Sequence, residues 1–267
     1  MPYFLTTDGC RIFFEDRYLG ASKPLVVLVN GTCQTTVHWT VIANLLKDDF
    51  QVLLYDGRAQ GRSDLGEIPL SLEGHTGDLH DLLRHLGAEK ANLVGISHGA
   101  GVALTFAARH PDLVERTVAC SITAHRTSRT KLFVKSWVRI LEHGGVDAMI
   151  QAALPVFFGE KFLRENDAML DKIMRALVLR NTKDGLTAHL RAVEDYPPLA
   201  RIAPAVACPV MVLSGSDDPL TPPASARELA ELCKGRHEIL EGPGHSIPAE
   251  APALFAKMVK DWVNKTQ

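Results

Sequence analysis

Ser97 lies between two glycines in Gly95-Ile96-Ser97-His98-Gly99, a pattern that can present a serine hydroxyl for nucleophilic attack. The pattern carries this meaning only after a buried strand and before a helix. An apolar run at 92–94 precedes it and a helical pattern starts near residue 101, so both conditions hold. Side chains in place of the two glycines would collide with the backbone of so tight a turn. We therefore predict that Ser97 is a nucleophile rather than part of a surface turn.

A serine hydroxyl is a weak nucleophile at neutral pH and needs a general base that a third group orients. The chain has eleven histidines, so context must select the base. His245 follows Glu241-Gly242-Pro243-Gly244, a loop between the last predicted strand and the last predicted helix. By contrast, His75, His80, His85 and His110 are expected on solvated faces of helices. His245 is the predicted base.

The orienting acid is expected after the apolar run at 209–213, where Asp217 and Asp218 stand side by side before Pro219. A chain order of serine, acid and histidine is typical of a nucleophile on a strand-to-helix turn of this kind. Either aspartate could instead form a turn, a common use of Asp before Pro. The residues alone leave the choice between the two open.

The elements that must position these side chains alternate along the chain. Tyr3–Thr6 and Arg11–Asp16, joined at Asp8-Gly9, predict a hairpin with a tight primed turn. Continuous apolar runs predict buried strands at 25–29, 51–55, 91–94 and 209–213, with shorter ones at 117–120 and 238–240. Helical spacing lies between them, at 39–46, 79–86, 101–109, 224–233 and 254–263. This alternation predicts an α/β fold with a doubly wound, mostly parallel sheet.

The alternation breaks between residues 126 and 195, where helical patterns continue without a strand and end near Tyr196-Pro197-Pro198. We predict a helical lid at 126–195 inserted into one core formed by 1–125 and 196–267. Within the lid, Phe133, Trp137 and Ile140 can share one helical face. On another face Lys131, Lys135 and Arg139 recur every four residues, which indicates either a solvated face or attraction of an anionic substrate.

Composition sets the class of protein. Hydrophobic residues make up 46% of the 267 residues, enough for a sizeable core, and the formal net charge is -2. The absence of a basic excess argues against nucleic acid or a membrane surface as partner, and leaves a small-molecule substrate. Residues 1–8 lack the charged and apolar regions of a signal peptide, so a cytoplasmic location is expected. The five scattered cysteines indicate neither a disulfide framework nor a zinc site, and the oligomeric state is left open.

Over nearly its whole length the chain resembles the α/β-hydrolase superfamily, in its serine-nucleophile branch. Gly215-x-x-Asp218-x-x-x-Pro222 resembles the family's acid loop, which selects Asp218. Gly244-His245, with Glu250 and Pro252 downstream, resembles its histidine loop, and 56–64 resembles its D-x-R-G-x-G-x-S segment. The resemblance implies an α/β-hydrolase fold and a Ser97–Asp218–His245 triad. A serine nucleophile argues against haloalkane dehalogenase or epoxide hydrolase activity, which use aspartate.

The resemblance also implies an oxyanion hole built from backbone N–H groups, assigned by position to Thr32 and His98. Here Asn30-Gly31 replaces the family's usual His-Gly, with Trp39 at the expected distance. Asn30 can hydrogen-bond in place of that histidine. We assign Asn30, Cys33 and Trp137 to substrate binding, with Cys33 as pocket wall rather than as a reactive thiol. The lid is loosely similar to those of 3-oxoadipate enol-lactonases and related small esterases.

These residues predict hydrolysis of a small carboxylic ester, lactone or thioester through an acyl-enzyme, without cofactor or metal. Two alternatives are kept. The elbow also resembles that of cofactor-free dioxygenases that cleave heteroaromatic rings of the 3-hydroxy-4-quinolone type, but these tend to carry the acid after the sixth strand, where this chain has Cys120-Ser121-Ile122. The third possibility is a small-molecule sensor on a hydrolase scaffold.

Overall fold

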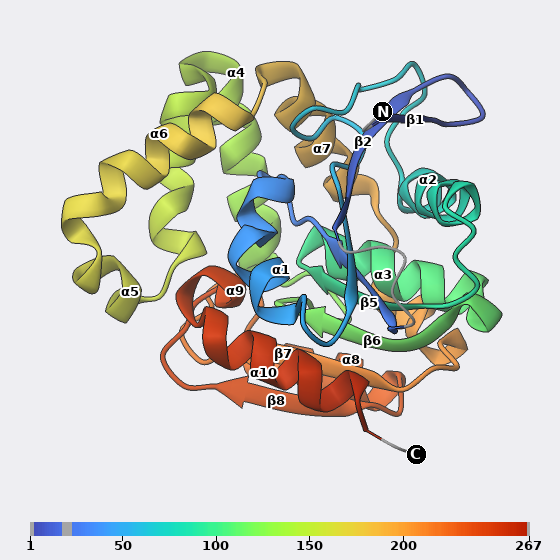
Figure 1. The fold of residues 1–267 in the computed structure, drawn as a ribbon. Coiled ribbons are helices and arrows are strands. Elements are labelled where there is room, and N and C mark those ends of the chain that lie inside the picture. Colours follow the sequence, from blue (N-terminus) through green and yellow to red (C-terminus); the bar gives the residue numbers. More distant parts are fainter. Residues whose placement is uncertain (1–2, 18–22, 266–267) are drawn as a thin grey trace.

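The computed structural model describes residues 3–17 and 23–265; Met1 and Pro2, at the start of the stretch considered for a signal peptide, lie outside them. One eight-stranded sheet runs through the molecule in the order β1-β2-β4-β3-β5-β6-β7-β8 (Figure 1). Its strands are β1 Tyr3–Leu5, β2 Arg11–Arg17, β3 Leu25–Val29, β4 Gln51–Tyr55, β5 Ala91–Ile96, β6 Val114–Cys120, β7 Val210–Gly215 and β8 Arg236–Leu240.

Strands β3 to β8 pair in parallel, whereas β1 pairs with β2 and β2 pairs with β4 in antiparallel fashion. All six apolar runs that predict strands form strands of this sheet. The runs in the central parallel strands are apolar because these strands are covered on both faces, whereas β8 lies at the edge of the sheet and is only partly buried. The predicted doubly wound, mostly parallel α/β sheet is confirmed.

The predicted hairpin is confirmed, but its predicted turn is wrong. The connection spans residues 6–10, Gly9 alone has a positive φ (80°), and its N–H donates to the Thr6 carbonyl. A primed turn would need positive φ at Asp8 as well. A side-chain hydrogen bond from Thr6 to Asp8 at 2.5 Å and one from the Cys10 N–H to the Thr6 hydroxyl at 3.0 Å stabilise the longer loop.

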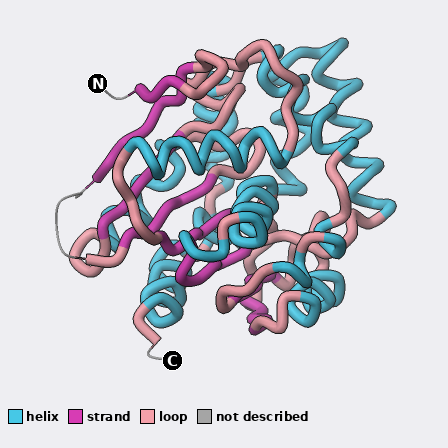
Figure 2. Tube along the Cα trace, turned by 90° about the vertical axis from the view of Figure 1, so that its right-hand side faces the viewer, coloured by secondary structure: helices cyan, strands magenta, loops and turns pink. Residues whose placement is uncertain are grey.

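Helices cover both faces of the sheet (Figures 1 and 2). On one face α2 (Leu72–His85), α3 (His98–Arg109) and α8 (Pro223–Leu232) bury their apolar sides against the strands. On the other face α1 (Thr40–Leu46) and α10 (Pro252–Val263) do the same, and the short α9 (Ile247–Glu250) precedes α10. Alternate residues of β3 belong to the two cores: Val27 faces α2 and α3, whereas Val26 and Leu28 face α1 and α10.

The segment between β6 and β7 is helical, and Figure 1 shows its first three helices gathered beside the sheet. It consists of α4 (Ser128–Phe157), α5 (Glu160–Glu165), α6 (Leu170–Arg180) and α7 (Lys183–Asp195). Thr127 and Thr182 accept backbone N–H groups at the starts of α4 and α7, as N-caps do. Gly145, at φ 78°, kinks α4. A third hydrophobic cluster lies between these helices and the loop after β3.

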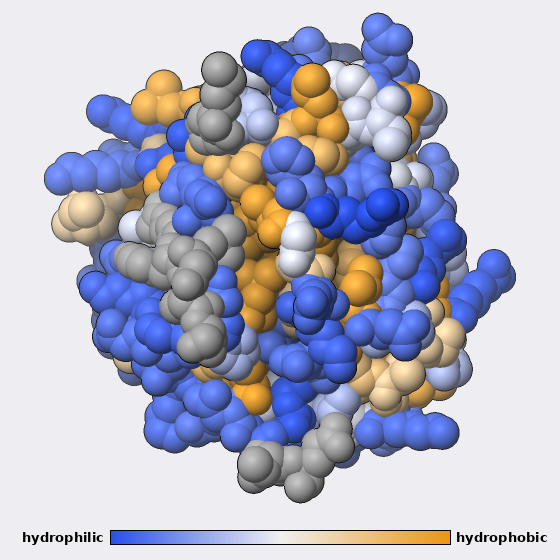
Figure 3. Space-filling view, turned by 45° about the vertical axis from the view of Figure 1, so that its right-hand side comes forward, coloured by the Kyte–Doolittle hydropathy of each residue, from blue (hydrophilic) through white to orange (hydrophobic). Residues whose placement is uncertain are grey.

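No helix among the described residues combines the length and apolar composition needed to cross a membrane. Hydrophilic residues dominate the face of the molecule seen in Figure 3, and apolar residues gather in a band near its centre.

Candidate active site

Ser97 lies in a strained turn between β5 and α3. Its backbone has φ 53° and ψ -119°, in the left-handed half of φ that non-glycine residues rarely adopt. A Cβ on Gly95 would overlap the Gly99 carbonyl, and one on Gly99 would overlap the carbonyl of Val29, so both positions require glycine. The Ser97 N–H donates to the Cys120 carbonyl at 2.8 Å, which ties the turn to β6. The strain is held by the packed sheet beneath it.

Asp218 and His245 form a buried hydrogen-bonded pair, with 2.8 Å between Asp218 Oδ2 and His245 Nδ1. The other oxygen, Oδ1, accepts the N–H groups of Leu220 at 2.8 Å and Thr221 at 3.0 Å. Burial acts to raise the pKa of Asp218, but the charge and hydrogen bond of His245 and the Thr221 hydrogen bonds outweigh it, so the pKa lies below its ordinary value. An ionised Asp218 accepts the Nδ1 proton and leaves Nε2 free as a base.

Asp217 has a different environment. Its Oδ2 accepts the N–H of Glu160 at 2.7 Å, at the first residue of α5. The Glu250 carboxylate accepts the N–H of Gly159 at 2.9 Å together with those of Gly244 at 2.9 Å and Ser246 at 3.1 Å. The start of α5 is therefore fastened to both the acid loop and the histidine loop.

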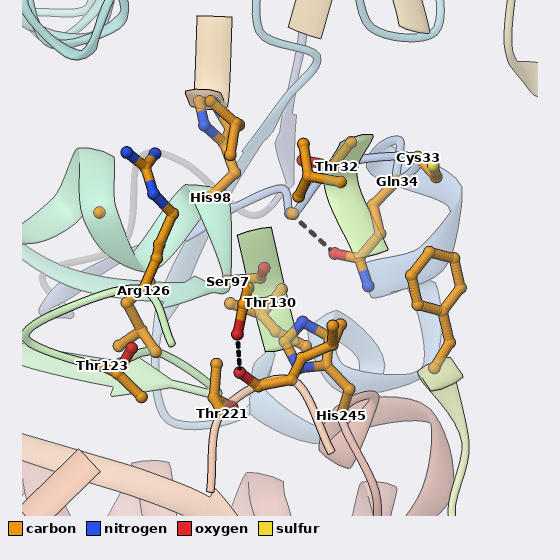
Figure 4. A pocket seen from close by; sticks show the side chains of 18 of the residues that line it. Thr32, Cys33, Gln34, Ser97, His98, Thr123, Arg126, Thr130, Thr221 and His245 are labelled. Atoms are coloured by element: carbon orange, nitrogen blue, oxygen red, sulfur yellow. Dashed lines mark hydrogen bonds between the residues drawn. The ribbon is translucent and has the colours of Figure 1, made fainter. Parts of the chain in front are cut away.

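Ser97 and His245 line the same cavity, from the ends of β5 and β8 (Figure 4). No hydrogen bond joins the serine hydroxyl to the histidine among the residues that the structure describes. Such bonds are often long in unliganded enzymes and tighten when substrate binds. Ser121 donates its hydroxyl to the His245 carbonyl at 2.8 Å and so holds the histidine loop from beneath.

The two backbone groups assigned to an oxyanion hole are not engaged elsewhere. Within the described residues, neither the Thr32 N–H nor the His98 N–H has a hydrogen-bond partner in the protein. The His98 N–H also belongs to the first turn of α3, where the helix dipole favours negative charge. Figure 4 shows the His98 ring extending away from Ser97 and His245, so only its backbone faces the site.

Asn30 does not contact the cavity, and its assignment to substrate binding is corrected. It is 2% exposed, its amide donates to the Tyr55 carbonyl at 2.9 Å and to Asp56 at 3.3 Å, and its oxygen accepts Trp39 Nε1 at 2.9 Å. With its polar atoms so engaged, Asn30 has no group to offer a ligand. It holds the loop after β3, the structural task expected of it in place of histidine.

Cys33 and Trp137 both line the cavity. Burial raises the pKa of the Cys33 thiol to about 12, so the group is a neutral apolar wall at physiological pH. Trp137 is buried between Phe133 and Phe157, with ring centroids 5.8 and 5.5 Å away. Phe157 in turn lies 6.5 Å from the His245 ring, centroid to centroid.

The cavity measures about 300 Å³ and opens at the carboxyl ends of the strands. Loops after β3, β5, β6, β7 and β8 form its floor, and helices α4, α6 and α7 form its roof.

Sequence reasoning missed Arg126, which lines the cavity from the loop after β6 (Figure 4). The Arg126 guanidinium donates to the carbonyls of Glu194 at 3.0 Å and Tyr196 at 2.9 Å. No motif surrounds Arg126 in the sequence, so only the fold reveals it.

Of the basic stripe, Lys131 reaches the cavity, and Lys135 and Arg139 are exposed without an ion pair in the described chain.

The prediction that the helix histidines are solvated is wrong for His75, which is only 4% exposed. His75 stands one turn before Leu79, on the stripe of α2 that packs against the core, and this spacing is the signal that identifies it as buried. It lies against His98 and His189. Among the residues that the structure describes, these three form a group of potential metal ligands close enough together to hold one ion.

Comparisons with known proteins agree with this geometry. The model of the alpha/beta hydrolase family matches residues 26–258. The "Putative carbamate hydrolase RutD" of Pseudomonas savastanoi pv. phaseolicola is 27% identical over 248 residues, covering 91% of this chain and 95% of that protein. The crystal structure of the enol-lactonase from Burkholderia xenovorans LB400 superposes with a TM-score of 0.90 at 28% identity, over 99% of this chain and 100% of the other. A thermophilic esterase from Thermogutta terrifontis superposes with a TM-score of 0.86 at 26% identity, over 98% and 97%. The chain therefore belongs to the alpha/beta hydrolase family and is a hydrolase of that type.

Proposed function

We propose that this hydrolase cleaves a small carboxylic ester, lactone or thioester through a covalent acyl-enzyme on Ser97. The observation that carries the proposal is the buried Asp218–His245 hydrogen bond of 2.8 Å beside a serine held in a strained turn at the same cavity. Nucleophilic acyl transfer uses a carboxylate that orients an imidazole, and an imidazole that takes the proton of the attacking hydroxyl.

In the proposed reaction the Ser97 oxygen attacks the substrate carbonyl while His245 Nε2 takes the hydroxyl proton. Asp218 stabilises the imidazolium that forms, because its carboxylate accepts the Nδ1 proton and stays ionised. The carbonyl oxygen becomes negative and receives the N–H groups of Thr32 and His98. His245 then protonates the leaving group. In deacylation His245 takes a proton from a water molecule that attacks the acyl carbon, and returns it to the Ser97 oxygen as the bond between Ser97 and the acid breaks.

We further propose that residues 126–195 form a lid over a core made of 1–125 and 196–267. Helices α4, α6 and α7 supply the roof of the cavity, and α5 begins at contacts with the acid and histidine loops. Closure of this roof on a substrate would exclude water and bring Ser97 and His245 within hydrogen-bond distance.

The cavity supports a small substrate. Its volume of about 300 Å³ lies at the lower end of the range for ligand pockets. Most lining residues above Ser97 are apolar, and Arg126 with Lys131 offers positive charge at one side. A short acyl chain or a single ring bearing an anionic group fits this lining best. The names of similar proteins add enol-lactones and carbamates to the compounds worth testing.

The dioxygenase alternative lacks support in the loop after β6, where enzymes of that kind tend to carry their acid. The loop after β6 begins with Ser121, whose hydroxyl binds the His245 carbonyl, and residues 121–124 include no carboxylate. His245 Nδ1 instead pairs with Asp218 after β7, the arrangement that a serine hydrolase needs.

The test is turnover by wild type and Ser97→Ala on nitrophenyl esters, lactones, acyl thioesters, carbamates and 3-hydroxyquinolones, with oxygen uptake monitored. Wild type should hydrolyse at least one ester, lactone or thioester, and Ser97→Ala should lose about three or more orders of magnitude in kcat. Oxygen uptake with a quinolone, unaffected by Ser97→Ala, would replace the proposal with the dioxygenase. Tight binding without turnover of any compound would replace it with a sensor.

A further inference from the structure

Three buried histidines meet where the helical segment touches the core. His75 on α2, His98 on α3 and His189 on α7 are 4%, 8% and 2% exposed. Their ring centroids lie 4.7 to 5.3 Å apart, and one ligand nitrogen from each ring lies within 4.8 Å of the other two. Three imidazoles from three separate helices rarely converge by packing alone, because apolar side chains fill such positions at lower cost.

Each ring has a buried nitrogen without a hydrogen-bond partner: Nε2 of His75, Nδ1 of His98 and Nδ1 of His189. A buried polar atom without a partner costs about 1–3 kcal/mol. Three such atoms in one cluster would destabilise the fold substantially. A single metal ion bound to one nitrogen of each ring would give such atoms a partner without adding a protein group.

One of the rings has a defined tautomer. His189 Nε2 lies 3.0 Å from the Arg58 carbonyl, which can only accept, so Nε2 carries the proton and Nδ1 carries a lone pair. A backbone carbonyl on the far nitrogen is the usual support of a histidine that binds a metal.

We propose that His75, His98 and His189 bind one divalent transition-metal cation of the zinc type, which fastens α7 to the core helices α2 and α3. Three neutral imidazoles with an open fourth position match the ligand preference of such ions. Zinc–nitrogen distances of about 2.0–2.1 Å place tetrahedral ligands about 3.3–3.4 Å apart, so the ligand atoms move together by up to about 1.4 Å through ring rotation.

Arg58, whose carbonyl supports His189, is itself paired with two carboxylates, Asp8 and Asp78, at 2.6 Å each, which offset its positive charge beside the cluster. Asp78 also follows His75 by one turn of α2. His98 follows Ser97 directly in the chain. The ion would thus fix the residue next to Ser97 as well as α7.

Zinc binding to the full-length protein tests this directly. Wild type that is stripped of metal with a chelator, incubated with zinc and then dialysed should retain about one zinc ion per chain, as measured by mass spectrometry and as expected for a single site. Zinc at about 100 times its Kd should raise Tm by about 5–10 °C in a chain of this size. His189→Gln keeps a donor for the Arg58 carbonyl but removes the ring Nδ1, and should bind zinc at least about 100-fold more weakly.

Two further variants separate this site from others. His143→Gln removes an exposed histidine of α4 and should bind zinc like the wild type. His75→Leu replaces a ligand by an apolar side chain and should show no increase of Tm with zinc. The proposal fails if wild type neither retains zinc nor gains Tm, which would leave a buried water molecule as the shared partner. It fails equally if His189→Gln and His75→Leu bind zinc as tightly as wild type, which would place the ion elsewhere.

Discussion

Asp217 and Asp218 are adjacent in the chain, yet their carboxylates face different partners. Asp218 accepts from His245, whereas Asp217 accepts from the backbone of Glu160. Because a side chain's role follows from what its atoms contact, the two aspartates should respond differently to substitution.

Asp218→Asn should lower kcat by about four orders of magnitude, because an amide cannot hold the imidazole in the tautomer that leaves Nε2 free. Asp217→Ala should leave kcat within a few-fold of wild type and cost about 1 kcal/mol of stability, the value of one hydrogen bond. Steady-state kinetics and thermal unfolding of both variants check this. Similar losses of kcat in the two would mean that the acid has been misassigned.

The Cys33 thiol gives a pH-dependent test. Its pKa is raised to about 12 by burial, so the reactive thiolate is scarce at pH 8 and increases only as the pH approaches 12. Iodoacetamide at pH 8 should therefore leave Cys33 unmodified in the folded protein, as measured by peptide mass spectrometry. Unfolded protein, in which the thiol returns to its ordinary pKa, is the positive control. Rapid alkylation of Cys33 in the folded state would show a reactive thiol at the site.

At the scale of elements, cationic side chains lie in and beside the cavity at two different places. Arg126 is partly buried on the β6 loop and held by two carbonyls, whereas the stripe of Lys131, Lys135 and Arg139 lies on the exposed side of α4. A charge held near a bound ligand acts through direct contact, whereas exposed charges act over distance and are screened by salt.

Arg126→Gln should raise KM for an ester bearing a carboxylate by about 10- to 100-fold, the value of a charge-assisted hydrogen bond, at low and high salt alike. Neutral esters should be unaffected. Replacing the three stripe residues by Gln should lower kcat/KM for the same anionic ester only at low salt. Arg129→Gln, at an exposed position three residues from Arg126, is the control and should change neither. Equal kinetics of Arg126→Gln and wild type on the anionic ester would exclude Arg126 from anion binding.

Elements differ in how well the sequence predicts them. Strands such as Leu25–Val29 are predictable because burial on both faces forces a continuous apolar run. The Thr6–Cys10 loop is mispredicted because Asp8-Gly9 suits several turns, and side-chain hydrogen bonds from Thr6 decide between them. His75 is mispredicted because a polar type on a helix suggests solvent, although its spacing from Leu79 places it on the buried stripe.

At the scale of the whole molecule, the candidate site is assembled from residues more than a hundred positions apart. The motifs around Ser97, Asp218 and His245 indicate these three residues because each follows a strand, and parallel strands end at one edge of the sheet. Arg126 and the His75–His98–His189 cluster have no such signal. Both are placed by the packing of α7 on the core, which no local pattern encodes.

The central claim is that Ser97 is the nucleophile, and labelling with a fluorophosphonate followed by peptide mass spectrometry tests it most directly. The account predicts one adduct per folded chain, on the peptide that contains Ser97, because only a serine activated by a base reacts readily with this reagent. Labelling should disappear in Ser97→Ala and slow strongly in His245→Ala. An unlabelled folded wild type, or an adduct on any residue other than Ser97, would contradict the account.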